Sequence, residues 1–199
     1  MQMDLPNGLQ RAGPSDWRKL GEITAEAFAE DPVNLWMFGN QRAMKTAFTV
    51  LARAIYAKQG FCYFAGDQGA AMWSENALPF KAGLWDMLSF GLGVSRYGTK
   101  GAMKRAQEAG ETMSRHHPKE PHYYLFTIGT RKAARGKGVG KALLAPVLTR
   151  CDQIGMPCYL ENSNPANHGF YRAHGFERRQ IFPAGEGGPP MEAMWRTPR

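Results

Sequence analysis

The feature that most constrains this chain is a strand-like run that passes through a basic, glycine-rich turn into a long amphipathic helix. Residues 123–128 read Tyr-Tyr-Leu-Phe-Thr-Ile, an aromatic and β-branched run that predicts a strand. Gly136, Gly138 and Gly140 then alternate at the start of a helix expected over residues 136–154. Glycines there remove side chains where the unpaired N–H groups of a first helical turn can close on an anion. The segment therefore predicts a phosphate-binding helix start.

The positive charge of the chain is concentrated around this turn. The 199 residues carry a formal net charge of +8. Residues 96–141 contain eleven basic and three acidic residues, and eleven minus three equals the whole excess. Five basic residues and no acidic one lie between Arg131 and Lys141. Such a block attracts phosphate on a nucleotide, a nucleic acid or a membrane surface, and a solvated basic face is the simpler alternative.

Composition narrows the class of protein. A chain with 43% hydrophobic and 21% charged residues is expected to fold as one packed globular domain. Cys62, Cys151 and Cys158 form neither a CxxC pair nor a Cys/His cluster, which argues against a disulfide framework and against a metal site. The first ten residues lack a secretory signal, and the apolar stretches are too short to cross a bilayer. We expect a cytoplasmic protein without a membrane partner.

The remaining segments predict one mixed α/β sheet, because helices come first, strands then alternate with helices, and a hairpin closes the chain. We expect the first helix to begin at Ser15 or Asp16 and to end at Asp31-Pro32. The other expected helices cover residues 41–58, 80–114 with glycine breaks, 136–154 and 165–174. The expected strands are residues 9–12, 61–64, 70–73, 123–128, 158–161, 177–182 and 191–196.

Two familiar phosphate-binding loops do not match the glycine-rich turn. The turn has no GxxxxGK[ST] pattern, which argues against a P-loop nucleotidase. The dinucleotide-binding GxGxxG pattern also fails, because the third glycine follows at a spacing of two and no acidic residue stands about twenty positions further on.

A third phosphate-binding pattern does match. Arg135-x-x-Gly138-x-Gly140 resembles the R/Q-x-x-G-x-G/A signature of the GCN5-related N-acetyltransferases, the GNAT family. Downstream, Asn164-x-x-Asn167-x-x-Phe170-Tyr171 is similar to the second signature of that family. Segments at 27–32, 117–121, 159–164 and 187–190 resemble the branch that contains puromycin N-acetyltransferase.

The resemblance implies a fold and a cosubstrate. Residues 1–199 would form a single N-acetyltransferase domain whose signature-bearing part is 117–196. Its mixed, mostly antiparallel sheet would be flanked by helices and splayed at the central parallel strand pair. The cosubstrate would be acetyl-CoA, with no metal, and the protein would be a monomer or a homodimer. The residues expected to bind coenzyme A are Ile128, Gly129, Thr130, Arg135, Gly136, Lys137, Gly138, Val139, Gly140, Lys141, Asn164 and Asn167.

Acetyl transfer also needs an oxyanion donor, an acid and a base. The resemblance implies that the backbone N–H of Ile128 faces the thioester oxygen and that Tyr171 protonates the departing thiolate. Tyr171 could instead be an aromatic core residue, and Asn164 could be a helix cap rather than a coenzyme contact. Glu161 is the candidate base that frees the amine, although a strand-end carboxylate in a salt bridge is an open alternative. His117 and His122 are weaker candidates for this role.

The expected function is transfer of an acetyl group from acetyl-CoA to the primary amine of a small molecule. Acetylation of a protein or peptide amine is an alternative, and a coenzyme-binding sensor without turnover is another. A basic nucleic-acid-binding module is less favoured, because it gives the glycines no purpose; we expect no nucleic-acid partner. Trp85, Leu88, Phe90 and Leu92 would either line an apolar acceptor pocket or form ordinary helix core.

Overall fold

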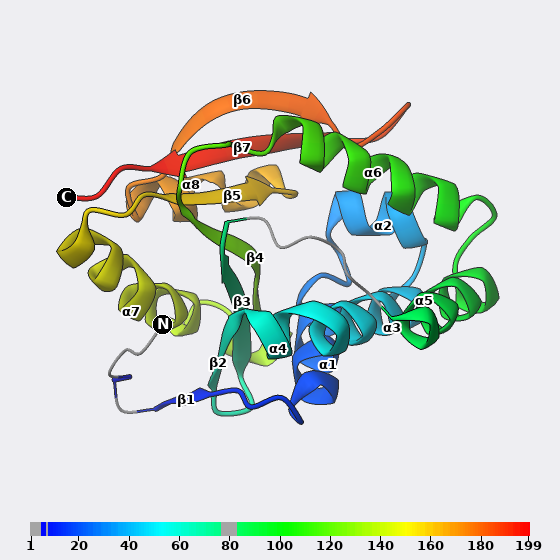
Figure 1. Ribbon diagram of the computed structural model, residues 1–199, viewed down its shortest axis with the longest axis horizontal. Coiled ribbons are helices and arrows are strands. Elements are labelled where there is room, and N and C mark those ends of the chain that lie inside the picture. The colour runs from blue at the N-terminus through cyan, green and yellow to red at the C-terminus, as the bar shows by residue number, and fades with distance from the viewer. Residues whose placement is uncertain (1–4, 7, 77–82) are drawn as a thin grey trace.

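The computed structural model describes residues 5–6, 8–76 and 83–199, and Figure 1 shows its arrangement. Residues 80–82 of the expected 80–114 helix lie outside these ranges. None of the described helices is long and apolar enough to span a bilayer, and the cytoplasmic location stays a prediction. The elements are β1 (Leu9–Arg11), α1 (Trp17–Ala27), α2 (Pro32–Phe38), α3 (Gln41–Leu51), a π-helical turn (Ala52–Tyr56), α4 (Ala57–Gln59), β2 (Phe61–Ala65), β3 (Gly69–Glu75), α5 (Leu84–Tyr97), α6 (Ala102–His116), β4 (Tyr123–Thr130), a 3-10 turn (Lys132–Ala134), α7 (Val139–Ile154), β5 (Cys158–Asn162), a 3-10 turn (Pro165–Asn167), α8 (His168–Ala173), β6 (Glu177–Pro183) and β7 (Pro190–Arg196).

The sheet has seven strands in the order β1-β2-β3-β4-β5-β7-β6. Every neighbouring pair is antiparallel except β4 and β5, which are parallel. These two strands pair only at Tyr123 with Cys158 and at Tyr124 with Tyr159, and then separate. The predicted fold class, including the splay at the central parallel pair, is confirmed.

Helices cover both faces of the sheet (Figure 1). Successive residues of β2 and β3 point to opposite faces, and both sets are apolar, so each face needs a helix to bury it. On one face, α7 packs its apolar stripe against alternate residues of these strands, and α1 packs against the other set. The residues on the α7 side include Phe61, Tyr63, Ala71, Trp73, Leu143, Leu144 and Val147, and those on the α1 side include Leu20, Ile23, Cys62, Phe64, Ala70 and Met72.

The prediction that Asp31-Pro32 ends the first helix is wrong. Helix α1 ends at Ala27, and Asp31 instead caps the start of α2. Its Oδ1 accepts the backbone N–H of Asn34 at 2.9 Å, and Pro32 occupies the first helical position, where a missing N–H costs nothing. The predicted 136–154 helix likewise begins later, at Val139, with Gly138 as its N-cap.

A bulge in β4 turns one aromatic side chain toward the helices. Met72 pairs with Thr127 and Trp73 pairs with Leu125, so Phe126 is the extra residue on β4. Its ring stacks on Tyr56 of the π-helical turn, with centroids 4.2 Å apart. The predicted helix over 41–58 is thus interrupted by a π-helical turn where it meets the bulge.

Helices α1 and α3 approach closely at Gly21. A Cβ built on Gly21 would lie 2.6 Å from Cα and 2.7 Å from the backbone N of Thr49. These are backbone atoms, so only movement of a helix relieves the clash. The glycine therefore sets the spacing of the two helices that carry Phe28 and Phe48 toward the site.

We predict that Gly21→Ala destabilises the protein, by about 1–3 kcal/mol as for other overpacked cores. The matched control is Gly91→Ala, because Gly91 is also helical but has no heavy atom within 4 Å of the added Cβ. There the substitution should stabilise by about 0.5–1 kcal/mol through helix propensity. Urea unfolding of both variants measures the difference, and an unaffected Gly21→Ala variant would contradict the close approach.

Candidate active site

Two cavities lie on either side of the gap between β4 and β5. The first, which we call the loop cavity, has a volume of about 600 Å³ and is lined by the glycine-rich turn, the end of β4 and the start of α8. The second, which we call the apolar cavity, has a volume of about 590 Å³ and is lined mainly by α2, α3, α5, α6 and β4. Both cavities are lined by Phe28, Ile128, Asn167 and Tyr171.

The loop cavity is built around the exposed start of α7. Gly138 has φ of +80°, a conformation that L side chains rarely adopt, and no side chain caps the helix. The N–H groups of Val139, Gly140 and Lys141 belong to the first turn, so they lack intrahelical partners. Open N–H groups and the positive end of the helix dipole make this a site suited to an anion.

Three basic residues of the turn are paired with acidic residues in the described ranges, and two are not. Arg131, Lys132 and Arg135 form ion pairs with acidic residues, among them Glu26 and Glu30 of the α1 end. Hydrogen bonds from Lys132 and Arg135 lower the pKa of Glu30. The Arg135 guanidinium also donates to the carbonyl oxygen of Ala27 at 3.1 Å. These three cations therefore anchor the turn to α1.

Lys137 and Lys141 differ from those three cations. Both are exposed and form no ion pair with another described residue. Salt bridges to acidic residues in and after α1 hold the first part of the basic block. Arg135 also lines the loop cavity, so its contact with the coenzyme stays a prediction. The side-chain charge that stays available beside the open helix start comes from these two lysines.

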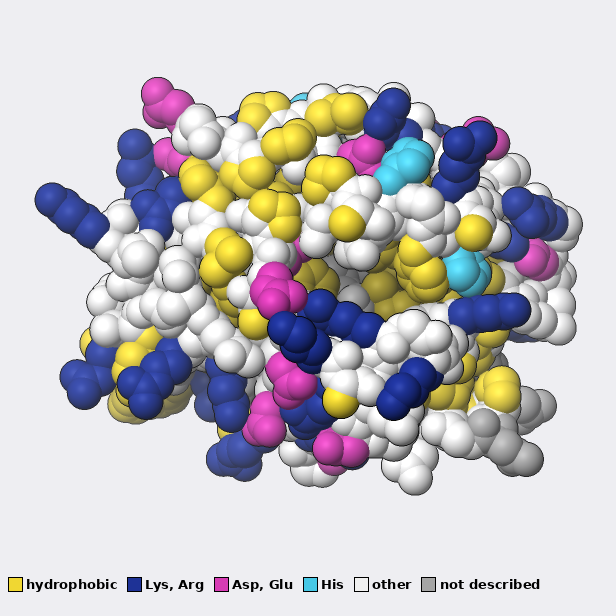
Figure 2. All heavy atoms as spheres, turned by 180° about the vertical axis from the view of Figure 1, so that it is seen from behind, with side chains coloured by type: hydrophobic (Ala, Val, Ile, Leu, Met, Phe, Trp, Pro, Cys, Tyr) yellow, Lys and Arg dark blue, Asp and Glu magenta, His cyan; other side chains and the backbone are white. Residues whose placement is uncertain are grey.

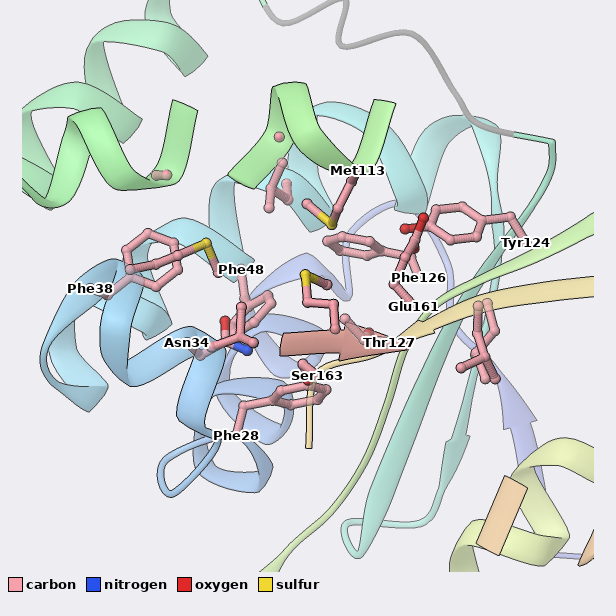
Figure 3. A pocket seen from close by; sticks show the side chains of 18 of the residues that line it. Phe28, Asn34, Phe38, Phe48, Met113, Tyr124, Phe126, Thr127, Glu161 and Ser163 are labelled. Atoms are coloured by element: carbon pink, nitrogen blue, oxygen red, sulfur yellow. The ribbon is translucent and has the colours of Figure 1, made fainter. Parts of the chain in front are cut away.

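The apolar cavity is hydrophobic along most of its wall. Five methionines and five phenylalanines line it, and the only charged lining side chains among the described residues are Glu111 and Glu161. Figure 3 shows Glu161 and Tyr124 together at one end, with Phe28 and Phe38 toward the other. In Figure 2 one face of the molecule is hollowed near its centre and hydrophobic side chains show in the recess, with charges of both signs beside it. Such a space suits an apolar ligand that carries one polar or cationic group.

Tyr171 lies at the junction of the two cavities. Its side chain, at the second turn of the segment that follows β5, is 8% exposed. Burial raises the pKa of the phenol, and the nearby Asp31 carboxylate raises it further. The phenol therefore stays protonated at neutral pH, as a proton donor must.

Asp31 connects α2 to the end of β5 across the junction. Ser163 Oγ donates to Asp31 Oδ2 at 2.6 Å, while Asp31 Oδ1 accepts from the backbone and side-chain N–H groups of Asn34. The carboxylate is buried and its two oxygens are both occupied. Sequence reasoning missed this residue; the Asp-Pro pair, a frequent helix start, was the available signal.

Glu161 is a buried carboxylate at one end of the apolar cavity. Its side chain is 3% exposed, and Oε1 has no hydrogen-bond partner among the described residues. The His117 ring lies beside it, with Nδ1 3.4 Å from Oε1. Burial is the main cause of the raised pKa of Tyr124 and Tyr159, and the charge of Glu161 raises both further. Buried polar atoms normally have a hydrogen-bond partner, so this oxygen is suited to accept a hydrogen bond from a ligand in the cavity.

The two predicted asparagines line the cavities, whereas most of the predicted apolar cluster does not. Asn164 lines the loop cavity, but its Oδ1 accepts the N–H of Ala166 at 3.0 Å, so the cap that was its alternative role is observed. Asn167 lines both cavities. The expected apolar cluster is wrong: Trp85 is 80% and Leu92 is 70% exposed, so neither belongs to the core. Leu88 is also exposed, and of the four only Phe90 lines the cavity.

Within the described ranges, no group of three or more His, Cys, Asp or Glu side chains is placed to hold a metal ion. Cys62, Cys151 and Cys158 are all buried and unbridged, and the last two belong to the core under α7.

Comparison with known proteins identifies the type of fold and enzyme. Residues 101–176 match the family model of the acetyltransferase (GNAT) family. An uncharacterized N-acetyltransferase of Schizosaccharomyces pombe (strain 972 / ATCC 24843) is 27% identical over 207 residues, which span 95% of this chain and 83% of that protein. A crystal structure of histone acetyltransferase HPA2 and related acetyltransferase from Corynebacterium glutamicum has a TM-score of 0.69 at 28% identity, with 96% of each chain covered.

A more distant structure shares the fold alone. PaiA N-acetyltransferase from Thermoplasma acidophilum, in complex with coenzyme A, has a TM-score of 0.55 at 11% identity, with 99% of each chain covered. Together the family model and the relatives support the GNAT family and confirm the prediction of an N-acetyltransferase. The likeness to the puromycin N-acetyltransferase branch stays a prediction.

We predict that Gly138→Glu weakens coenzyme A binding at least 100-fold, because it adds bulk and negative charge where the first-turn N–H groups face the loop cavity. Isothermal titration with coenzyme A measures the affinity. Gly187→Glu is the matched control: Gly187 also has positive φ, at +66°, and open space around its Cβ, but lies in the turn between β6 and β7. Unchanged affinity in Gly138→Glu would show that the anion site is elsewhere.

Proposed function

For a chain with the fold and the signatures of the GNAT acetyltransferases, we propose transfer of the acetyl group of acetyl-CoA to the primary amine of a small, apolar molecule. One observation carries the proposal: the cavity at the helix start and the apolar cavity meet at Ile128 and Tyr171. A donor bound in the first and an acceptor bound in the second would therefore place their reacting atoms at the same point. Direct attack needs this proximity.

The coenzyme would occupy the loop cavity. Its diphosphate suits the N–H groups of Val139, Gly140 and Lys141, and Lys137 adds positive charge nearby. Beyond the paired residues Tyr123 and Tyr124, β4 has no strand partner on the β5 side among the described residues. The amide-bearing pantetheine arm can pair with that open edge as an extra strand would. Asn167, which lines both cavities, is placed to contact the end of the arm.

The reaction would proceed by one attack and one expulsion. The amine nitrogen forms a bond to the thioester carbon, and the carbonyl electrons move to oxygen, where the backbone N–H of Ile128 stabilises the negative charge. The C–S bond then breaks, and Tyr171 donates its phenolic proton to the departing thiolate. The phenolate regains a proton as the coenzyme leaves. A protonated primary amine loses two protons on forming the amide: Glu161 accepts the first, directly or through water, before the attack. The second, lost after the C–N bond has formed, replaces through water the proton that Tyr171 gave up.

The wall of the apolar cavity supports a small acceptor with an apolar body. A hydrocarbon or aromatic group would be buried among the methionines and phenylalanines, while the amine would lie near the unpartnered oxygen of Glu161. Methionine side chains adapt to varied apolar shapes, so the cavity suits a class of amines more than a single one. A polyamine would leave charges unpaired against this wall, at a large cost in desolvation. The likeness to the puromycin branch makes puromycin a useful member of a test series, and we place the reaction in the cytoplasm.

We predict that Tyr171→Phe lowers kcat by about 10²- to 10⁴-fold, the usual contribution of a general acid, while the Kd for coenzyme A changes less than threefold. The variant removes one oxygen from a buried ring, so the packing against Phe176 is retained. Thiol release measures kcat and isothermal titration measures Kd. Equal losses of turnover and coenzyme affinity would make the residue structural.

We predict that kcat/KM rises along a series of unbranched alkylamines from butyl to octyl. Each buried methylene is worth about 0.8 kcal/mol, which corresponds to about a fourfold increase per carbon until the cavity is full. Puromycin and 2-phenylethylamine test aromatic bodies, and spermidine and a peptide with a free N-terminus test the alternatives. A flat alkylamine series, with spermidine or the peptide preferred, would contradict an apolar small-molecule acceptor.

A further inference from the structure

Two histidines form a chain behind Glu161, on the side away from the apolar cavity. His117 Nδ1 lies 3.4 Å from Glu161 Oε1, and His117 Nε2 lies 2.9 Å from His122 Nε2. On its far side, His122 Nδ1 lies 2.7 Å from the backbone carbonyl oxygen of Glu120. Three titratable groups are thus connected from the cavity to the loop before β4.

The chain is held rigidly in place. The backbone N–H of His122 donates to Asn76 Oδ1 at 2.9 Å, and the His122 carbonyl oxygen accepts the N–H of Asn76 at 2.9 Å. The His122 residue is 2% exposed. The ring of His117 packs edge-on against Tyr124 and Tyr159, with centroids 4.8 and 4.9 Å away. Fixed rings at these distances can pass a proton without a conformational search.

The hydrogen-bond partners fix where the protons lie on the two neutral histidines. The Glu120 carbonyl oxygen only accepts, so His122 Nδ1 carries a proton. One proton lies between the two Nε2 atoms, and a neutral His122 places it on His117. A neutral His117 then turns a bare Nδ1 toward Glu161. A carboxylate and a bare ring nitrogen both accept, so the contact is favourable only when one further proton is present.

That further proton can occupy three positions, and the total number of protons on the chain is the same in each. It can lie on Glu161 as a carboxylic acid, on His117 as an imidazolium, or on His122 as an imidazolium with His117 neutral. Two transfers connect the first position with the last: Glu161 O–H to His117 Nδ1, and His117 Nε2–H to His122 Nε2. His117 gains a proton at Nδ1 and gives up another from Nε2, so the extra proton's position moves from Glu161 to His122 while the number of protons stays the same.

We propose that His117 and His122 act as a proton relay for Glu161, taking the proton of the incoming ammonium away from the apolar cavity. The inference rests on the proposed function, because it assigns a path to the proton that acetyl transfer must remove. The ammonium N–H bond breaks toward the carboxylate, and the two transfers then carry the positive charge to His122. When the product leaves, the same two transfers run in reverse and Glu161 gives the proton to water that enters the apolar cavity, so both rings regain their starting tautomers. His117 and His122 touch neither acceptor nor coenzyme, so they act through Glu161.

The surroundings favour return of the proton from His122 once the acetyl group has been transferred. Tyr56, Tyr124 and Tyr159 are the titratable groups that surround Glu161 besides His117, and all three phenols have raised pKa values, mainly through burial. Burial lowers the pKa of His122, so its imidazolium gives up a proton readily. Around His122 lie Tyr159, Trp195 and the Glu120 loop; Arg179 stacks on Trp195 and pairs with Glu120 at 3.6 Å.

The test compares two forms of one acceptor. We expect His117→Asn, which keeps a donor near Glu161 but transmits no proton, to lower kcat/KM for 2-phenylethylamine at least tenfold at pH 7. For the β,β-difluorinated analogue, which is a much weaker base and reaches the enzyme largely uncharged, the loss should be less than threefold. With 2-phenylethylamine the variant should gain about tenfold per pH unit below the amine's pKa, because it now requires the free amine. Wild type should stay nearly flat above pH 7.

Two further variants separate the relay from a structural role. His122→Asn should show the same dependence on amine basicity as His117→Asn. His116→Asn is the matched control, since the neighbouring ring stacks on Phe182 and lies outside the chain; it should behave as wild type with both amines. Equal losses with the two amines at every pH would overturn the relay. If wild type acetylated no amine of the series, the proposed function would fail, and the relay with it.

A measurement on wild type needs no variant. Histidine ¹⁵N NMR at high pH should find neutral His122 protonated at Nδ1 and neutral His117 protonated at Nε2. The opposite tautomers would break the path at its first link and overturn the proposal, whatever the variants do.

Discussion

β4 and β5 pair through two residues and then part, and both cavities open onto the gap that this leaves. A strand edge buried without a partner is normally costly, because its polar backbone groups lose water. Two features lie beside the gap and leave it open. The bulge at Phe126 turns that side chain toward the helices, and the Asp31–Ser163 hydrogen bond holds α2 against the end of β5. The open edge is then available to a ligand that carries amides of its own.

The charges near the gap are arranged so that the anion site stays open. Salt bridges to α1 hold the first part of the basic turn, and the helix start beyond it is free of side-chain caps. On the other side of the junction, the proposed acceptor space carries only carboxylates among its charged lining residues. A phosphate is thus favoured on one side and an ammonium on the other. In the proposed function this separation of charge would orient the donor and the acceptor toward Tyr171.

Much of the fold could be predicted from the sequence, because it depends on local pattern. The 123–128 run, the glycine-rich turn and the following amphipathic helix are all present, and the family resemblance supplied the splay. The Asp31-Pro32 helix start is a local signal, and only its interpretation as a helix end was wrong. Other features depend on partners distant in sequence: Arg135 pairs with Glu30 across 105 residues, and Phe90 of α5 lines the cavity whereas Trp85 faces solvent. The chain of Glu161, His117 and His122 joins β5, the end of α6 and the start of β4, so no spacing in the sequence reveals it.

The most direct test of the central claim is a crystal structure of the acetyl-CoA complex. The account predicts the diphosphate on the N–H groups of Val139, Gly140 and Lys141, and the pantetheine arm along the open edge of β4. It further places the thioester oxygen about 2.7–3.1 Å from the N–H of Ile128, with the sulfur beside Tyr171. A coenzyme bound away from the start of α7, with the gap between β4 and β5 closed, would contradict it.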